Sequence, residues 1–158
     1  MSNLSQDAFY QSLLNRRAGS GALFTDEAGR ILVVEPLYKT TWEVPGGIVE
    51  KGEGPRTTCK RECLEELGLD VDPGRLLAIE HKTENLPQGN SIMFIYCCGT
   101  LLDASVIQLQ EEELRSFRFV AAEDLGRLMN AGLAHRVRCA VRARHEGTTF
   151  EIVNGVVM

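Results

Sequence analysis

Three glutamates between residues 55 and 67 could bind a divalent cation if the chain is helical there. At about 100° per residue, Glu62, Glu65 and Glu66 fall within an arc of roughly 100° on one helix face. Glu62 and Glu66 are four residues apart, and their like charges should destabilise a helix. Arg61 is spaced to neutralise Glu65, but no cation is spaced to neutralise Glu62 or Glu66. A hard cation that takes oxygen ligands, such as Mg²⁺, would balance their charge.

The residues around these glutamates favour a helix over 55–67. Pro55 fits the first turn, where a missing N–H costs nothing, and Gly68 fits the position just past the end. Before the helix, Gly46 and Gly47 permit a tight bend with exposed backbone carbonyls. The arc beside the glutamates is apolar enough to pack on a core, and it consists of Cys59, Cys63, Leu64 and Leu67.

The stretch from Gly47 to Leu69 resembles the Nudix box, G-x5-E-x7-R-E-U-x-E-E-x-G-U, in which U is a bulky apolar residue. One position departs mildly, because Cys63 stands where an aliphatic residue is commoner. Specified positions at fixed spacing are a far stronger signal than a lone glycine motif. The residues that match are Gly47, Glu53, Arg61, Glu62, Glu65, Glu66, Gly68 and Leu69.

The resemblance implies a Mg²⁺-dependent hydrolase, with Mn²⁺ as a substitute, that cleaves a phosphoanhydride bond. Its expected substrate is a nucleoside diphosphate linked to another moiety, a class that includes NTPs, dNTPs, nucleotide sugars, ADP-ribose-like molecules and dinucleoside polyphosphates. Clustered carboxylates repel a polyanion, whereas a cation can bridge the two and acidify a bound water. The implied metal ligands are the Gly46 carbonyl, Glu62, Glu65 and Glu66. The implied catalytic residues are Glu62, Glu66, Glu53 near the metal, and Arg61, which orients a box glutamate.

The general base has two possible sources, since Nudix enzymes take it from the box or from a downstream loop. Glu113 lies six residues before Phe119, in an Arg-Phe-Val segment that resembles the family's frequent Arg-Trp-Val. That spacing matches a further metal ligand or base in some members. A solvated acidic run over residues 111–113 is an equally good interpretation.

Substrate recognition has the weakest signal in the sequence. Trp42 could stack on a nucleobase, as could Tyr38 or Phe94, although aromatic residues in strands usually belong to the core. Lys82 and Asn85 lie in a long polar linker, and we expect them to contact the substrate. The sequence lacks the residues and motifs that mark the ADP-ribose, diadenosine polyphosphate and coenzyme A subfamilies. Four arginines on the last helix could contact phosphate or a partner subunit, but we interpret them as mostly solvated: Arg136, Arg138, Arg142 and Arg144.

Composition narrows the class of protein. The chain has 158 residues, 44% of them hydrophobic, which suits a single domain over 1–158. A net charge of −5 disfavours polymeric nucleic acid as a partner, because its binding depends on cationic side chains. No apolar run of 18 residues and no signal segment is present, so we expect a cytoplasmic protein without a membrane partner. The five cysteines form no C-x-x-C, which disfavours zinc, and a homodimer is compatible with the sequence.

The pattern of elements predicts an α/β fold, and the resemblance implies an α/β/α sandwich with a mixed β-sheet. A hairpin turn is expected at 26–29, and residues 1–15 form a short helix or a loosely held arm. A catalytically inactive Nudix-fold sensor that binds a nucleotide is the alternative, but it should have lost box glutamates. A third hypothesis is an isomerase of the isopentenyl diphosphate type, which shares the fold but has a box that departs from this one. Strands are expected at 18–25, 30–35, 42–44, 75–81, 91–102, 117–120 and 148–153, and helices at 55–67, 122–133 and 134–145.

Overall fold

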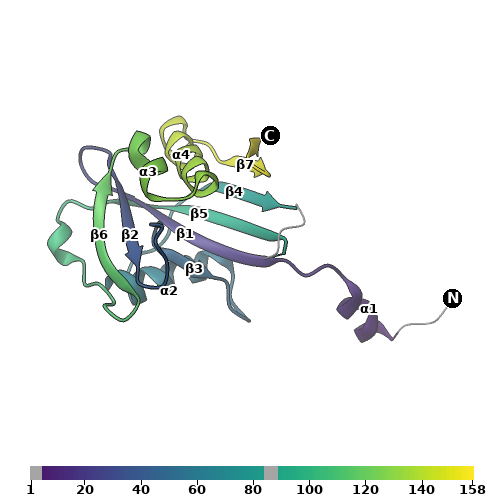
Figure 1. Cartoon of the computed structure of the whole chain (residues 1–158). Helices are drawn as coiled ribbons and strands as arrows, with labels where there is room; N and C mark the ends of the chain where they lie inside the picture. Colours follow the sequence, from purple (N-terminus) through teal and green to yellow (C-terminus); the bar gives the residue numbers. More distant parts are fainter. Residues whose placement is uncertain (1–4, 84–88) are drawn as a thin grey trace.

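A mixed β-sheet forms the centre of the structure, a computed structural model that describes residues 5–83 and 89–158 (Figure 1). Within these residues the sheet runs in the order β6-β2-β1-β5-β4-β7-β8, and β3 pairs with β1. The pairs β1–β5 and β4–β7 are parallel and the others antiparallel, which confirms the mixed sheet. The strands are β1 (Arg17–Thr25), β2 (Ile31–Pro36), β3 (Gly46–Ile48), β4 (Leu76–Lys82), β5 (Ser91–Thr100), β6 (Leu114–Val120), β7 (Phe150–Val153) and β8 (Val156–Val157).

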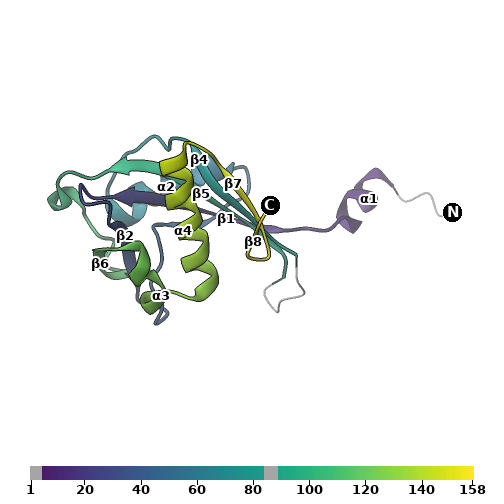
Figure 2. The same cartoon turned by 90° about the horizontal axis from the view of Figure 1, so that it is seen from above.

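Helices cover both faces of the sheet (Figures 1 and 2). Helix α2 (Pro55–Leu67) packs on one face, and α3 (Leu125–Leu128) and α4 (Ala131–Glu146) pack on the other. Side chains alternate along β1, so Leu23 enters the core under α4 while Phe24 enters the core under α2. The expected α/β/α sandwich is thereby confirmed.

The turn between β1 and β2 forms as expected. Asp26 accepts backbone hydrogen bonds from Ala28 and Arg30 at 3.0 and 2.8 Å, and Gly29 takes the left-handed conformation with φ of 79°. Helix α1 (Gln6–Ser12) buries none of its residues and projects away from the sheet. No helix within the described part of the chain combines the length and apolar character needed to cross a membrane.

Two expected elements differ from the structure. The helix predicted over 122–133 is interrupted, because Met129 is extended and the Asn130 side chain accepts a hydrogen bond from the Leu133 N–H at 2.9 Å. Asparagine is a strong N-cap, and it starts α4 there. The strand predicted at 42–44 is a single bridge between Glu43 and Val34. The chain bends at Pro45, directly before Gly46 and Gly47, and the two glycines begin β3.

Candidate active site on helix α2

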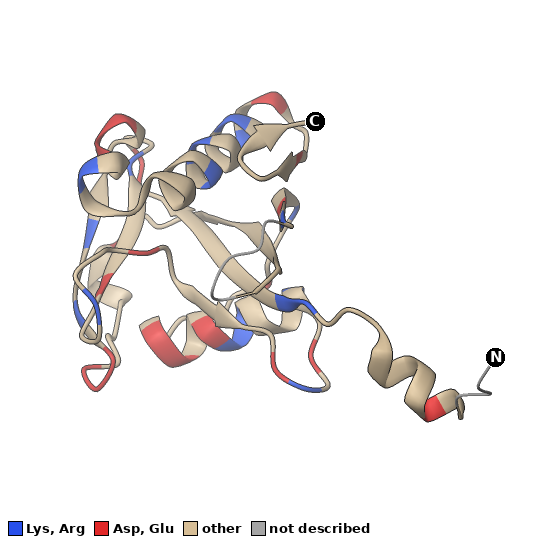
Figure 3. Ribbon diagram, turned by 45° about the vertical axis from the view of Figure 1, so that its right-hand side comes forward, with Lys and Arg blue, Asp and Glu red and all other residues tan. Residues whose placement is uncertain are grey.

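Helix α2 has the bounds that its terminal residues predict. Pro55 occupies its first turn, and Gly68 closes it in the left-handed conformation with φ of 67°. The Gly68 and Leu69 N–H groups bond to the carbonyls of Leu64 and Cys63, which satisfies the last turn. Cys59, Cys63 and Leu67 are fully buried as expected, whereas Leu64 is 52% exposed and does not join the core. Figure 3 shows acidic positions gathered on α2 and mainly basic positions along α4.

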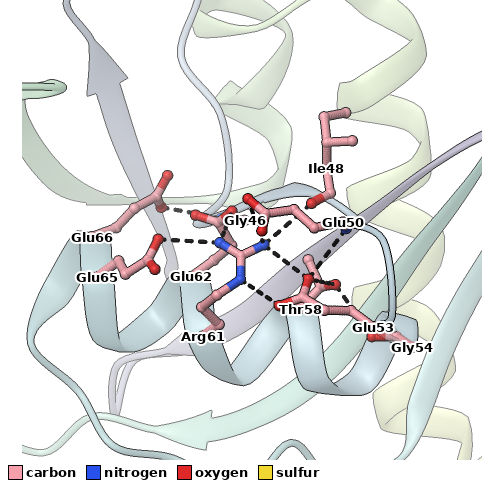
Figure 4. A network of polar contacts seen from close by, with 10 residues as sticks. All are labelled: Gly46, Ile48, Glu50, Glu53, Gly54, Thr58, Arg61, Glu62, Glu65 and Glu66. Carbon is pink, nitrogen blue, oxygen red and sulfur yellow. Dashed lines mark hydrogen bonds and ion pairs between the residues drawn. The ribbon is translucent and has the colours of Figure 1, made fainter.

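Arg61 organises the carboxylates at the N-terminal half of the site (Figure 4). Its Nη1 donates to Glu62 Oε1 at 2.9 Å and to Glu65 Oε2 at 3.1 Å. Its Nε and Nη2 donate to the two oxygens of Glu53 at 2.6 and 3.1 Å, and Nη2 also reaches the Ile48 carbonyl at 3.3 Å. The expected pairing with Glu65 is confirmed. The expectation that Glu62 lacks a cation is wrong, because Arg61 reaches its neighbour along the chain as well.

Glu53 is held as an ionised partner of this arginine. The Thr58 hydroxyl donates to Glu53 Oε2 at 2.8 Å, and the Glu50 N–H donates to the same oxygen at 3.2 Å. Hydrogen bonds from Arg61, then from Thr58, lower the pKa of Glu53 to about 2. The same contacts, led by the Glu53 hydrogen bond, raise the pKa of Arg61. Because both of its oxygens are engaged, Glu53 is built to position Arg61.

Glu66 is the buried carboxylate of the site. It is 7% exposed, and its Oε2 accepts the Gly46 N–H at 3.1 Å. No described cation forms an ion pair with it, as the sequence predicts. Burial raises its pKa to about 8, and the negative charges of Glu62, Glu43 and Glu113 act in the same direction. A cation bound at this carboxylate would relieve that repulsion.

Two glycines make room for these carboxylates. A Cβ on Gly47 would lie 2.1 Å from Glu62 Oε1, and a Cβ on Gly46 would lie 2.2 Å from the Ser20 carbonyl oxygen. Gly46 also has φ of 154°, and β3 holds it against β1. Any side chain at either position would displace Glu62 or the strand pairing.

The remaining predicted ligands lie around this centre. Glu65 is half exposed, with 51% of its side chain accessible, while Glu62 is at 13%. Burial raises the pKa of Glu62, and the charge of Glu65 adds to the effect. Glu113 is exposed, yet its charge contributes to the raised pKa values of both Glu62 and Glu66. The loop before β6 thus brings Glu113 to the carboxylate face.

The donor set fits a hard divalent cation. It consists of carboxylate and carbonyl oxygens, the ligands that Mg²⁺ takes, and one buried member lacks a cationic partner among the described residues. The residues that would hold the cation are Glu62, Glu65 and Glu66, together with the carbonyl of Gly46.

A cavity of about 340 Å³ is lined by Gly46 and Gly47 and by no residue of α2. Tyr38 and Phe94 line it, as do residues that sequence reasoning missed, including Glu43 and Arg136. Glu43 bonds to Lys39 and accepts from the Tyr38 hydroxyl at 3.4 Å, and nothing in its spacing relative to the box signals this position. Burial, then the charge of Glu43, raises the pKa of Tyr38 to about 12.

Arg136 forms a buried ion pair at the wall of this cavity. It is 6% exposed, and its Nε donates to Glu80 Oε2 at 2.5 Å. Glu80 is 2% exposed and also accepts the Gly155 N–H at 3.1 Å. The expectation that the arginines of the last helix are solvated is therefore wrong for Arg136, although Arg138 and Arg142 are exposed.

Of the three predicted substrate contacts, the structure describes Trp42 and Lys82. Trp42 is 7% exposed, belongs to the core under α4 and lies beneath the Arg118 guanidinium, 4.4 Å from its ring centroid. It is absent from the cavity wall, because its backbone N–H bonds to Leu128 and turns it inward. Lys82 is partly exposed at the end of β4, and Asn85 lies outside the described residues.

Comparisons with known proteins agree with this geometry. A family model described as the NUDIX domain matches residues 15–141. The Xenopus laevis protein named nucleoside diphosphate-linked moiety X motif 6 is 37% identical over 82 residues, which are 49% of this chain and 37% of that protein. A Pseudomonas putida RNA pyrophosphohydrolase is 32% identical over 62 residues, 39% of each chain.

Solved structures share the fold at lower identity. The crystal structure of an ADP-ribose pyrophosphatase from Streptococcus suis has a TM-score of 0.67 and 22% identity, and the match covers 89% of this chain and all of that one. The chain spans well under half the length of the curated relatives described above. The family model covers most of the chain, and the box glutamates, Arg61 and the glycines occupy one site on α2. The chain therefore belongs to the NUDIX domain family.

Proposed function

We propose that the protein hydrolyses a phosphoanhydride bond in a nucleoside diphosphate linked to another moiety, with Mg²⁺ or, as a substitute, Mn²⁺. The observation that carries this proposal is the buried Glu66 carboxylate, which has no cationic partner among the described residues and accepts the N–H of Gly46 beside the cavity. The pyrophosphohydrolase names of relatives in the family support the same reaction class.

The protein residues have separate roles in this proposal. Glu62, Glu65, Glu66 and the Gly46 carbonyl would hold the cation, which supplies charge neutralisation at the phosphates and a more acidic bound water. Arg61 fixes the orientation of Glu62 and Glu65 through its two Nη1 hydrogen bonds. Glu53 fixes Arg61 in turn. A displaced Arg61 or Glu53 would therefore disturb the orientation of the metal-binding glutamates without removing any of them.

Glu113 is proposed as an additional ligand or as the general base. Its carboxylate is exposed and forms no ion pair with a described residue, so it is free to accept a proton from water. Glu53 is a poor base by comparison, because hydrogen bonds from Arg61 and Thr58 hold its pKa near 2.

The cavity beside the glycines is the proposed site for the part of the substrate beyond the diphosphate. Its wall offers aromatic rings at Tyr38 and Phe94 and cationic groups at Arg17 and Lys39. Flat apolar surface with a few charged groups suits a base or sugar that bears phosphate. The proposed partner is therefore a small molecule.

A substrate panel tests the reaction directly. Nucleoside diphosphate derivatives are incubated with the protein and Mg²⁺, and the nucleotide and phosphate products are separated and quantified. Turnover that chelation abolishes and Mg²⁺ restores is the expected result. Saturable binding of a nucleotide without any product would instead favour the catalytically inactive sensor.

Lys82 and Tyr38 should influence which substrate is chosen. The metal ligands act on the diphosphate that all candidate substrates share, so selectivity must come from residues that reach further. We expect Lys82→Ala and Tyr38→Ala to change kcat/KM unequally across the panel, by at least about fivefold between substrates, while the Mg²⁺ dependence stays constant. A uniform loss on every substrate would exclude a role in selectivity. Asn85→Ala extends the comparison to the linker.

Cys63 should be dispensable for turnover. It is fully buried on the side of α2 that faces Phe24 and Leu32, away from the glutamates. We expect Cys63→Val to retain activity and to change the free energy of unfolding by only about 1 kcal/mol, since the two side chains are similar in volume. Denaturant titration and the panel assay measure both quantities. Rapid inactivation of the wild type by a thiol reagent that spares a folded Cys63→Val would contradict this.

A further inference from the structure

Three cysteine thiols meet behind the carboxylate face of α2. Cys59 and Cys63 are four residues apart on the buried side of the helix, and Cys98 projects from β5 toward them. Their three Sγ atoms all lie within 4.8 Å of one another, and those of Cys59 and Cys98 are 3.8 Å apart. All three are free thiols. We name this group the thiol cluster.

The spacing of the thiol cluster matches a metal coordinated by sulfur. With metal–sulfur bonds of about 2.3 Å, three thiolates around one ion lie about 4.0 Å apart in a plane and slightly closer in a tetrahedron. The measured 3.8 Å therefore needs little adjustment. Thiolates are the ligands that Zn²⁺ and Cu⁺ prefer, while Mg²⁺ prefers the oxygens on the opposite side of α2.

Polar groups lie beside the thiol cluster. The Arg56 guanidinium stacks on the Tyr96 ring at 4.7 Å, and its positive charge acts on Cys59. The Ser20 hydroxyl, which is 3% exposed, also interacts with Cys59. It has no nitrogen or oxygen hydrogen-bond partner among the described residues. A buried hydroxyl without such a partner is costly.

We propose that Cys59, Cys63 and Cys98 form a second metal site, which binds one thiophilic d¹⁰ cation of the Zn²⁺ and Cu⁺ class independently of the carboxylate site. Cys98 is only partly buried, so the ion enters from its side, while Cys59 and Cys63 are fully enclosed. A Zn²⁺ ion with three thiolate ligands has a net charge of −1, and the positive charge of Arg56 offsets it. The sequence hides this site, because its ligands come from a helix and a strand rather than from a C-x-x-C motif.

The test titrates Zn²⁺, and in a separate anaerobic experiment Cu⁺, into the reduced full chain with a large excess of Mg²⁺ present. Stoichiometry is measured by metal analysis after gel filtration, and affinity by competition with a chromophoric chelator. We expect one tightly bound ion per chain, a thiolate charge-transfer band in the ultraviolet for Cu⁺, and a higher Tm. Glu66→Gln should bind the ion as the wild type does.

Matched variants assign the site. Cys98→Ala and Cys63→Val should each weaken binding by at least about 100-fold, the scale on which loss of a direct ligand exceeds loss of its supporting contacts. The control is Cys97→Ala, because Cys97 is adjacent in the chain but packs on the other face of the sheet. Cys97→Ala should bind normally. If Cys98→Ala fails to fold, Cys63→Val decides the outcome.

Three results would overturn the proposal. They are the absence of a bound ion in the reduced wild type, binding that Glu66→Gln removes, and equal binding by Cys63→Val and the wild type. A response to only one of Zn²⁺ and Cu⁺ would support the site and identify its ion. None of these readouts depends on turnover, so they stand apart from the proposed hydrolase activity.

Discussion

Glu66→Gln is expected to keep the fold and lose most of the turnover, by about two orders of magnitude or more. The amide can still accept the Gly46 N–H that the carboxylate now accepts at 3.1 Å, so the bend beside α2 should survive. What is lost is one negative oxygen ligand, and with it the charge stabilisation that the cation provides in the transition state. The measurement is kcat against Mg²⁺ concentration for the best substrate of the panel.

Glu27→Gln is the matched control for this variant, because Glu27 is an exposed glutamate in the β1–β2 turn, far from α2. It should turn over at the wild-type rate. Near-normal turnover by Glu66→Gln at limiting Mg²⁺ would remove Glu66 from the set of ligands.

The same variant should change how stability depends on pH when no divalent metal is present. Burial raises the pKa of Glu66 from 4.5 to about 8, so the folded protein holds this proton more tightly than the unfolded chain does. The contribution to stability is complete below pH 4.5 and is lost as the pH rises toward 8. Glu66 alone therefore lowers the free energy of unfolding by at most about 1.4 kcal/mol per pH unit in that window. Glu66→Gln should remove this slope in chelator-treated samples, as the difference between paired denaturant titrations.

Arg136→Ala should be the most destabilising single substitution among the arginines of α4. It leaves Glu80, which is 2% exposed, without the guanidinium that now bonds to it at 2.5 Å. Removal of one partner from a buried pair costs about 3–5 kcal/mol, because the other charge stays buried. For a chain of this size, the loss corresponds to a fall in Tm of roughly 10 °C. Thermal and denaturant unfolding measure both values.

Arg138→Ala is the control for Arg136→Ala. Arg138 is exposed, and its only hydrogen bonds within the described part of the chain go to the carbonyls of Ala122 and Glu123. Its loss should therefore cost under about 1 kcal/mol. Removing both buried charges, as in Arg136→Met with Glu80→Gln, should recover much of the lost stability. Equal effects of Arg136→Ala and Arg138→Ala would show that the buried pair contributes no more than a surface contact.

Local signals explain why much of the site is predictable from the sequence. Pro55 and Gly68 bound α2 because each suits one end of a helix by its backbone alone. The helical period then places Glu62 and Glu66 on one face without knowledge of the rest of the fold. The pairing of Arg61 with Glu65 follows from the same spacing.

Contacts between distant segments explain what the sequence does not predict. Arg136 and Glu80 are 56 positions apart, and an arginine on an amphipathic helix resembles its solvated neighbours until the fold buries it. Glu43 lies outside the box, so nothing in the box spacing predicts that its charge acts on Glu66. The sequence predicts one helix over 122–133 because the residues around Asn130 are all compatible with a helix. Only the hydrogen bond from the Leu133 N–H to the Asn130 side chain shows that a new helix begins there.

The parallel pairing of β1 with β5 also has a consequence for the rate at which this site forms and decays. The two threonines that end this ladder, Thr25 and Thr100, are 75 positions apart, so a long loop must close before their strands can pair. We expect β3, which carries both glycines of the site and pairs with β1, to form after that loop has closed. The carboxylate face should therefore be completed late in folding, after the rate-limiting barrier. A cation bound by Glu62 and Glu66 would then leave the refolding rate unchanged and slow unfolding, which gives the metal-loaded protein a longer lifetime at the same folding speed.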